Sequence, residues 1–150
     1  MQRIVVLGSA AAVSSAARDN TFLAFESQKG IVLLDCAGSP YQKLLKAGLN
    51  PERLKGIILT HAHPDHIYGL PSLIHHFMMT GRTAPLPVYA NRATLRVVKG
   101  VLGAMRLEGD FLIFSEIPRK EGYTVIDNEE YTIQTSPVRH IVPTVAVKIL

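Results

Sequence analysis

The sequence predicts an α/β fold, classed as α+β in some schemes, in which helices pack on one face of a mixed β-sheet. Two observations support this prediction. Short runs rich in Ile, Val and Leu end at turn residues, which is typical of buried strands, and they alternate with segments of helical periodicity. After Gly109 the pattern changes to successive strands, which indicates a meander. The chain has 150 residues, the length of one domain, and we place no internal boundary.

Strands are expected wherever a short apolar run is bounded by turn residues. Thr21–Glu26 and Ile31–Asp35 lie close enough in sequence to pair as an antiparallel ribbon. Asp127-Asn128 marks a turn between two of the later strands. The expected strands are Arg3–Leu7, Thr21–Glu26, Ile31–Leu34, Gly56–Leu59, Leu86–Tyr89, Phe111–Phe114, Tyr123–Ile126, Tyr131–Thr135 and Val145–Leu150.

Helices are expected between the earlier strands. Ser39-Pro40 combines an N-cap with a first-turn proline, and Gly48 is a plausible C-terminal stop for the helix that follows. The same cap and proline recur at Asn50-Pro51. Pro71–Thr80 and Arg92–Leu102 carry apolar residues at helical spacing, so each is expected to bury one face.

Composition excludes several classes of protein. The formal net charge of +4 suits an anionic substrate but is too small to indicate nucleic-acid binding by itself. The single cysteine, Cys36, excludes an internal disulfide framework and a four-cysteine zinc site. The apolar runs are too short to span a membrane, and Met1–Ala17 reads as a strand and loop, not as a signal peptide. We therefore expect a cytoplasmic protein with no membrane association.

The strongest chemical signal follows the strand Gly56–Leu59. Here the chain reads His61-Ala62-His63-Pro64-Asp65-His66. Residues two apart in an extended segment point the same way, so His61 and His63 can offer imidazoles to one ion. Asp65 and His66 follow the Pro64 turn and are expected to face a second ion, if the site is dinuclear. Imidazole nitrogen and carboxylate oxygen suit zinc, and we prefer a metal site to a solvated polar loop.

This motif, followed by Gly69-Leu70-Pro71, resembles the signature of the metallo-β-lactamase superfamily. The Gly-Leu-Pro tail is most similar to the ribonuclease Z-type phosphodiesterase branch. The resemblance extends from Arg3 to about Leu150. Further segments that agree with it are Leu7-Gly8-Ser9, Arg18-Asp19-Asn20-Thr21, Leu33-Leu34-Asp35-Cys36 and Ser136–Pro143.

The resemblance implies half of an αββα sandwich and a metal-dependent reaction. Two zinc ions, with manganese as the alternative, would activate water for attack on phosphorus, and Asp65 would orient that water and accept its proton. Asp35 would support the histidine loop from behind, although a cap at the end of its strand is an equally good interpretation. His140 lies in the segment that resembles the family's next histidine motif. The implied metal ligands are His61, His63 and His140 for the first ion, and Asp65 and His66 for the second.

Three features depart from the family's pattern. Ala37 stands where glycine is usual, and Ala10-Ala11-Ala12 replaces a loop in which relatives tend to have glycine, so we do not expect a phosphate cradle there. The chain ends at Leu150 within an apolar strand, and the family's later bridging aspartate and final histidine have no match. Residues 1–150 are therefore expected to be the N-terminal portion of such a domain.

Two functions remain open at this stage. The first is a dinuclear-zinc phosphodiesterase in full-length form, with precursor tRNA as one substrate. Within this class, hydrolysis of cyclic nucleotides, aryl sulfates or lactones by the same metal site are the alternatives. The second is a catalytically incomplete half-domain that binds at most one metal or pairs with another chain, including a second copy of itself. A pure RNA-binding module is less favoured, because basic and aromatic residues are not clustered.

Overall fold

The central layer is a six-stranded sheet formed by the short apolar runs of the sequence. A computed structural model describes residues 1–150. The strand order follows the chain order, with antiparallel pairing from β1 to β3 and parallel pairing from β3 to β6. The strands are β1 (Arg3–Gly8), β2 (Phe22–Ser27), β3 (Gly30–Leu34), β4 (Leu54–Ile58), β5 (Leu86–Ala90) and β6 (Leu112–Glu116).

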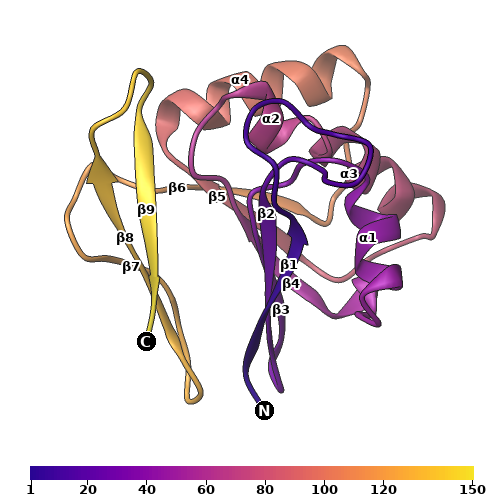
Figure 1. Cartoon of the computed structure of the whole chain (residues 1–150), viewed down its shortest axis with the longest axis horizontal. Coiled ribbons are helices and arrows are strands. Elements are labelled where there is room, and N and C mark those ends of the chain that lie inside the picture. The colour runs from indigo at the N-terminus through magenta and orange to yellow at the C-terminus, as the bar shows by residue number, and fades with distance from the viewer.

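Helices cover one face of this sheet, because each connects two parallel strands and must cross over the same side. Figure 1 shows them as one layer. Helix α3 buries Leu73, Ile74 and Phe77 against the sheet. No helix combines the length and hydrophobicity needed to span a membrane. The helices are α1 (Pro40–Lys46), α2 (Pro64–Ile67), α3 (Leu70–Met79) and α4 (Arg92–Ala104), and a 3₁₀ turn, η1, spans Pro51–Arg53.

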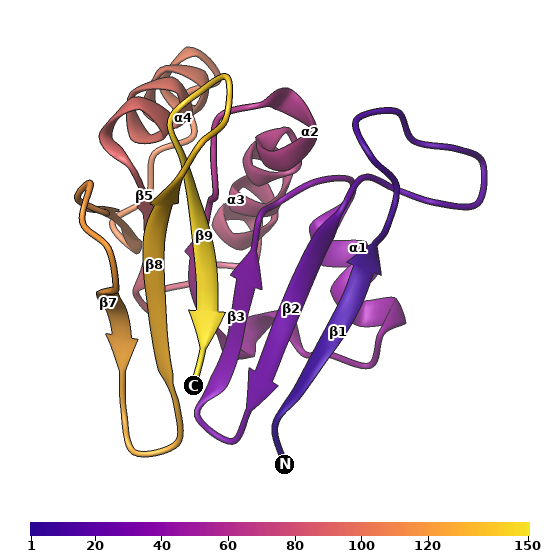
Figure 2. The same cartoon turned by 60° about the vertical axis from the view of Figure 1, so that its left-hand side comes forward.

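A three-stranded antiparallel sheet covers the other face, in the order β7 (Tyr123–Asp127), β8 (Thr132–Val138) and β9 (Thr144–Ile149). Figure 2 shows it beside β1–β3, and Figure 1 shows it on the side opposite the helices. A second hydrophobic core joins the two sheets, with Val32 and Ile58 on one side and Ile133 and Val145 on the other. The expected mixed sheet with helices on one face is confirmed.

The structure refines several expected elements. The strand expected at Phe111–Phe114 is not part of the late meander, because it pairs in parallel with β5 as the edge of the first sheet. The α4 crossover between them makes that pairing parallel. The short helix α2 was not expected, whereas the ribbon of β2 and β3 and the turn at Asp127-Asn128 are confirmed.

The parallel strands all end at one edge of the sheet. Asp35 follows β3, the Thr60–His66 segment lies just beyond β4, and Asn91 follows β5. Ligands of open α/β sheets bind beyond the carboxyl ends of the strands. This edge is therefore where the chemistry of the chain is concentrated.

Candidate metal centre

Two histidines of the motif face each other just beyond β4. His61 is buried, with 6% of its surface exposed, and His63 is half-buried. The Nε2 atom of His61 lies 2.8 Å from the Nδ1 atom of His63. Pro64 then begins α2, and its fixed φ suits a first helical turn. The extended segment before the helix is what directs both imidazoles to one point.

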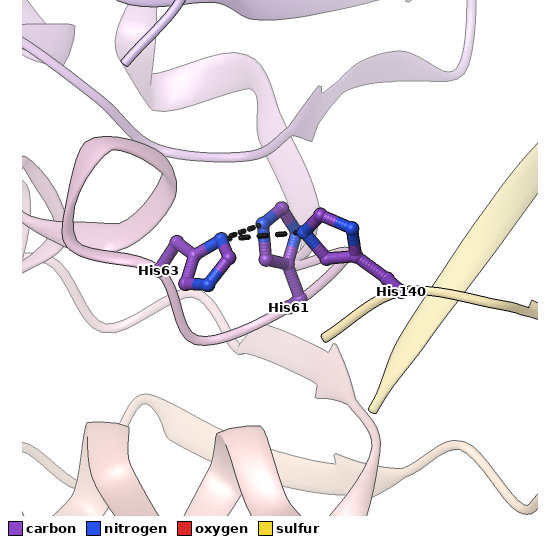
Figure 3. A group of neighbouring side chains, drawn as sticks. All are labelled: His61, His63 and His140. Atoms are coloured by element: carbon purple, nitrogen blue, oxygen red, sulfur yellow. Dashed lines mark hydrogen bonds between the residues drawn. The ribbon is translucent and has the colours of Figure 1, made fainter. Parts of the chain in front are cut away.

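A third histidine reaches the same point from the second sheet. His140 lies in the loop between β8 and β9, and its Nε2 atom is 3.4 Å from Nδ1 of His63. One ring nitrogen from each of the three histidines lies within 4.8 Å of the other two. Figure 3 shows the three rings pointing toward one another. Residues 77 positions apart thus meet only in the folded chain.

Two hydrogen bonds hold the His140 loop against the first sheet. The backbone N–H of Val145 donates to the carbonyl oxygen of Thr60 at 3.1 Å. The side-chain amide of Asn91 donates to the carbonyl oxygen of Pro143 at 2.8 Å. The loop that carries His140 is therefore fixed both to the histidine motif and to the end of β5.

Asp35 and Thr60 determine which ring nitrogen of His61 carries the proton. The Thr60 hydroxyl lies 3.0 Å from both carboxylate oxygens of Asp35 and 2.8 Å from Nδ1 of His61. A carboxylate only accepts, so the hydroxyl donates to Asp35 and accepts from the N–H at Nδ1. The Nε2 atom of His61 is then left with a free lone pair facing His63, as metal binding requires.

Asp35 also acts on the fourth histidine of the site. The Nδ1–H of His66 donates to Oδ2 of Asp35 at 2.7 Å, and this hydrogen bond is the largest cause of a raised pKa at His66. The Nε2 atom of His66 lies 3.4 Å from Oδ2 of Asp65. A single buried carboxylate thus orients two imidazoles, one directly and one through Thr60.

The backbone at Asp35 supports this role. Its φ is +62°, in the left-handed region that aspartate tolerates better than most residues. Its backbone N–H donates to the carbonyl oxygen of Ile58 at 2.8 Å, and the N–H of Cys36 donates to the carbonyl oxygen of His66 at 2.8 Å. Strained backbone of this kind persists where surrounding contacts enforce it, and such positions cluster at functional sites.

Burial keeps His61 neutral. Burial is the largest cause of a pKa lowered to about 4, and the nearby His66 adds to the effect while Asp35 opposes it. Metal binding requires a neutral imidazole, so His61 needs no deprotonation at neutral pH. His61 is therefore available as a neutral imidazole donor at neutral pH.

The structure brings together all the site residues expected from the sequence. His61, His63 and His140 form one cluster, while Asp65 and His66 lie beside it and Asp35 lies behind it. Thr60 was not among the residues expected from the sequence. A hydroxyl residue directly before the first histidine was the available signal. Outside this cluster, the Cys36 thiol is buried, which raises its pKa, and His75 and His76 are exposed on α3.

Two pockets flank the cluster. The larger has a volume of about 730 Å³, lies between α2, α3 and α4, and is lined mainly by hydrophobic side chains, with Ala62 and Pro64 at its border. The smaller has a volume of about 600 Å³ and includes His140 in its lining. The larger pocket thus borders the segment 62–64, and the smaller one borders His140.

The arrangement of strands and histidines has known counterparts. The family model of the metallo-beta-lactamase superfamily matches residues 19–141. The chain belongs to this superfamily.

Among curated relatives, ribonuclease Z of Methanococcus maripaludis strain C5 is 28% identical over 145 residues, which are 96% of this chain and 46% of that protein. Ribonuclease Z of Bradyrhizobium diazoefficiens is 32% identical over 140 residues, 93% of this chain and 46% of that protein. The chain spans about half the length of the curated relatives it matches.

Solved structures of the superfamily share the fold. The short form of human tRNase Z has a TM-score of 0.82 at 19% identity, covering 100% of this chain and 65% of that one. The metallo-beta-lactamase fold protein YhfI from Bacillus subtilis has a TM-score of 0.77 at 21% identity, covering 98% and 56%. The chain therefore has the metallo-beta-lactamase fold over a helix layer, a six-stranded sheet and a three-stranded sheet.

The metallo-beta-lactamase fold implies metal binding, and the residues present fit a metal ion. Three imidazole nitrogens converge within 4.8 Å. The nitrogen that His61 offers is left unprotonated by the Asp35–Thr60 pair, and its pKa is lowered. Nitrogen donors of this kind suit zinc and other borderline divalent ions.

Proposed function

We propose that the whole protein carrying this sequence is a metal-dependent phosphodiesterase of ribonuclease Z type, with precursor tRNA as a substrate. The observation that carries the proposal is the convergence of His61, His63 and His140 at the carboxyl edge of a metallo-beta-lactamase sheet. The relatives named ribonuclease Z favour a phosphodiester substrate over the sulfate or lactone substrates considered for the same metal site. A formal net charge of +4 suits such an anionic substrate.

In this proposal the cluster of three histidines holds one zinc ion, and Asp65 and His66 begin a second site. When bound, metal ions lower the pKa of water to provide a nucleophile at neutral pH and stabilise negative charge on phosphate oxygens. Manganese is the alternative ion, because imidazole and carboxylate ligands also accept it.

The chain's own residues prepare the site for this chemistry. Asp35 fixes the ring orientation of His66 directly and that of His61 through Thr60. Asp65 is half-buried beside these rings, and we assign to its carboxylate the acceptance of a proton from the attacking water. Preorganised groups of this kind cost no rearrangement when the reaction occurs.

A second candidate function follows from the unequal number of possible metal ligands at the two positions. Three histidines converge on one point, whereas Asp65 and His66 form the only donor pair beside it. Residues 1–150 by themselves are then a module that binds one metal ion and does not catalyse the reaction. The two candidates differ in whether residues outside this chain complete the second site.

The test is 3′-end cleavage of a precursor tRNA by the whole protein with added zinc or manganese. Asp65→Ala is expected to abolish cleavage, because it removes both a ligand and the proton acceptor. The matched control is His75→Ala on the exposed face of α3, which is expected to retain activity. Cleavage at an unchanged rate by Asp65→Ala, or no cleavage by the unsubstituted protein with either metal, would contradict the proposal.

A further inference from the structure

The smaller pocket beside the histidine cluster has a distinct chemical character. It occupies about 600 Å³ between the segment after β6 and the loop between β8 and β9. Two arginines and one histidine line it, and no acidic side chain does. Its charged and titratable lining residues are Arg119, Arg139 and His140.

Neither arginine is neutralised by the rest of the chain. The ion-paired arginines are Arg3, Arg53 and Arg82, which contact Glu26 or Glu52 elsewhere. Arg119 and Arg139 make no ion pair and donate no side-chain hydrogen bond to the protein, and both are exposed to solvent. Their guanidinium groups are therefore free to bind an anion.

Two hydrogen bonds anchor the segments that form the pocket, and one of them also supports the metal cluster. The N–H of Ile117, just before the Arg119 segment, donates to the carbonyl oxygen of Ala90 at 2.8 Å. The Asn91 side chain donates to the carbonyl oxygen of Pro143 at 2.8 Å, within the loop that carries Arg139. Both arginines thus extend from backbone that is anchored at the carboxyl edge of the first sheet.

We propose that Arg119 and Arg139 form a subsite for a non-scissile phosphate of a polynucleotide substrate. The inference rests on the proposed function, because it takes the scissile phosphate to lie at the histidine cluster. His140 belongs to the cluster and to the pocket wall, so the pocket adjoins the position of the scissile phosphate and can hold a neighbouring phosphate of the same strand. A guanidinium presents a planar fork of donors that matches phosphate oxygens in pairs.

The sequence alone did not indicate this subsite, because the two arginines are twenty residues apart and only Arg119 has a basic neighbour, Lys120. A phosphate contact of this kind reads the backbone and not the bases. The subsite is thus expected to favour substrates longer than a single nucleotide. Positioning by such contacts affects substrate binding more than the chemical step.

The experiment measures binding of a fluorescently labelled single-stranded RNA octamer to the zinc-loaded chain by anisotropy, over a series of KCl concentrations. The double variant R119Q/R139Q is compared with the matched double variant R96Q/R106Q, in which two exposed arginines outside the pocket are changed. We expect R119Q/R139Q to weaken binding by about tenfold and to lower the salt slope by about 0.7 for each arginine. R96Q/R106Q is expected to bind within about twofold of the unsubstituted chain.

The zinc-induced rise in melting temperature is measured on every variant and is expected to be unchanged, which separates loss of the subsite from loss of the metal site. RNA binding that is unaffected by R119Q/R139Q, or weakened equally by R96Q/R106Q, would overturn the proposal. So would a labelled mononucleotide that binds as tightly as the octamer. The whole protein could fail to cleave precursor tRNA while RNA binding by the chain still depends on Arg119 and Arg139. That result would overturn the proposed function but not the phosphate subsite.

Discussion

At the scale of single residues, one buried carboxylate organises the candidate centre. Asp35 accepts hydrogen bonds from Thr60 and from His66, and through Thr60 it determines which nitrogen of His61 faces the cluster. Partners that stand behind metal-binding histidines typically change metal affinity by about 10–100-fold when removed. Thr60 is therefore the residue at which this arrangement can be tested without changing any ligand.

Thr60→Val is expected to lower zinc affinity by about 10–100-fold, because valine keeps the shape of threonine and removes the hydroxyl that accepts from His61. Thr60→Ser is expected to restore most of the affinity, and Thr124→Val, an exposed position on β7, serves as the matched control. Competition against a zinc-binding dye measures the affinities. A Thr60→Val chain that binds zinc as tightly as Thr124→Val would show that the hydroxyl has no part in metal binding.

The spacing of His61, His63, Asp65 and His66 was enough to predict a metal site, because extended backbone places alternate residues on one side. His140 was recognised by resemblance alone, since nothing in the local sequence brings a residue 77 positions away to the same point. The role of Thr60 was missed because it depends on a hydrogen bond with Asp35 across two parallel strands.

At the scale of elements, the second sheet determines whether His140 reaches the cluster. This sheet is attached to the first by the core that contains Phe25, Ile58, Ile133 and Val145. Tyr131 adds an edge-to-face contact with Phe25 at a ring-centroid distance of 4.9 Å. Packing between the sheets is thus part of the metal site, although no residue of that core is a ligand.

Ile133→Ala on β8 is expected to lower the free energy of unfolding by about 2–5 kcal/mol, because Ile133 is fully buried between the sheets. The matched control is Ile113→Ala on β6, where the side chain is 45% exposed and the expected loss is about 0.5 kcal/mol. Urea unfolding measures both values. Equal losses for the two variants would show that the core between the sheets contributes little to stability.

Periodicity predicted most helices and strands to within a few residues, because a buried face repeats every two or about 3.6 residues. It did not predict α2, whose four residues are too few to show a helical repeat. It also assigned β6 to the wrong sheet. The helix expected at Arg92–Leu102 was the available signal, because a helix between two neighbouring strands favours parallel pairing.

At the scale of the whole molecule, the two sheets bring ligands from distant parts of the chain to one edge. Residues 1–150 bring His61, His63 and His140 together and place two further donor side chains, Asp65 and His66, beside them. The comparisons with ribonuclease Z proteins cover about 46% of those proteins. Activity is therefore a property we assign to the whole protein.

Residues 1–150 alone are expected to hydrolyse bis(p-nitrophenyl) phosphate negligibly, even with excess zinc or manganese. Two donors hold an ion weakly, and small errors in the position of a reacting group can cost on the order of 100-fold in rate. Release of p-nitrophenol measures the reaction. Zinc-dependent turnover by these residues that is lost in His63→Ala would show that the chain is catalytically complete.

The fold class was predictable from the whole sequence because alternating strand and helix patterns permit few layered arrangements. The resemblance through the histidine motif then narrowed it to the metallo-beta-lactamase architecture, which the match over residues 19–141 confirms. The two pockets beside the cluster were not predictable. Their walls combine segments such as α2 with α4, or the segment after β6 with the His140 loop, that lie far apart in sequence.

The central claim is that His61, His63 and His140 together bind a metal ion, and zinc-dependent thermal unfolding tests it most directly. Because these ligands meet only in the folded chain, bound zinc stabilises the fold and is expected to raise the melting temperature. Titration of the chain with zinc should show this rise, and native mass spectrometry should find at least one tightly bound zinc ion per chain. His63→Ala and His140→Ala should each largely abolish the rise, while His75→Ala should leave it unchanged. A zinc response in His63→Ala and His140→Ala equal to that of the unsubstituted chain would contradict the claim.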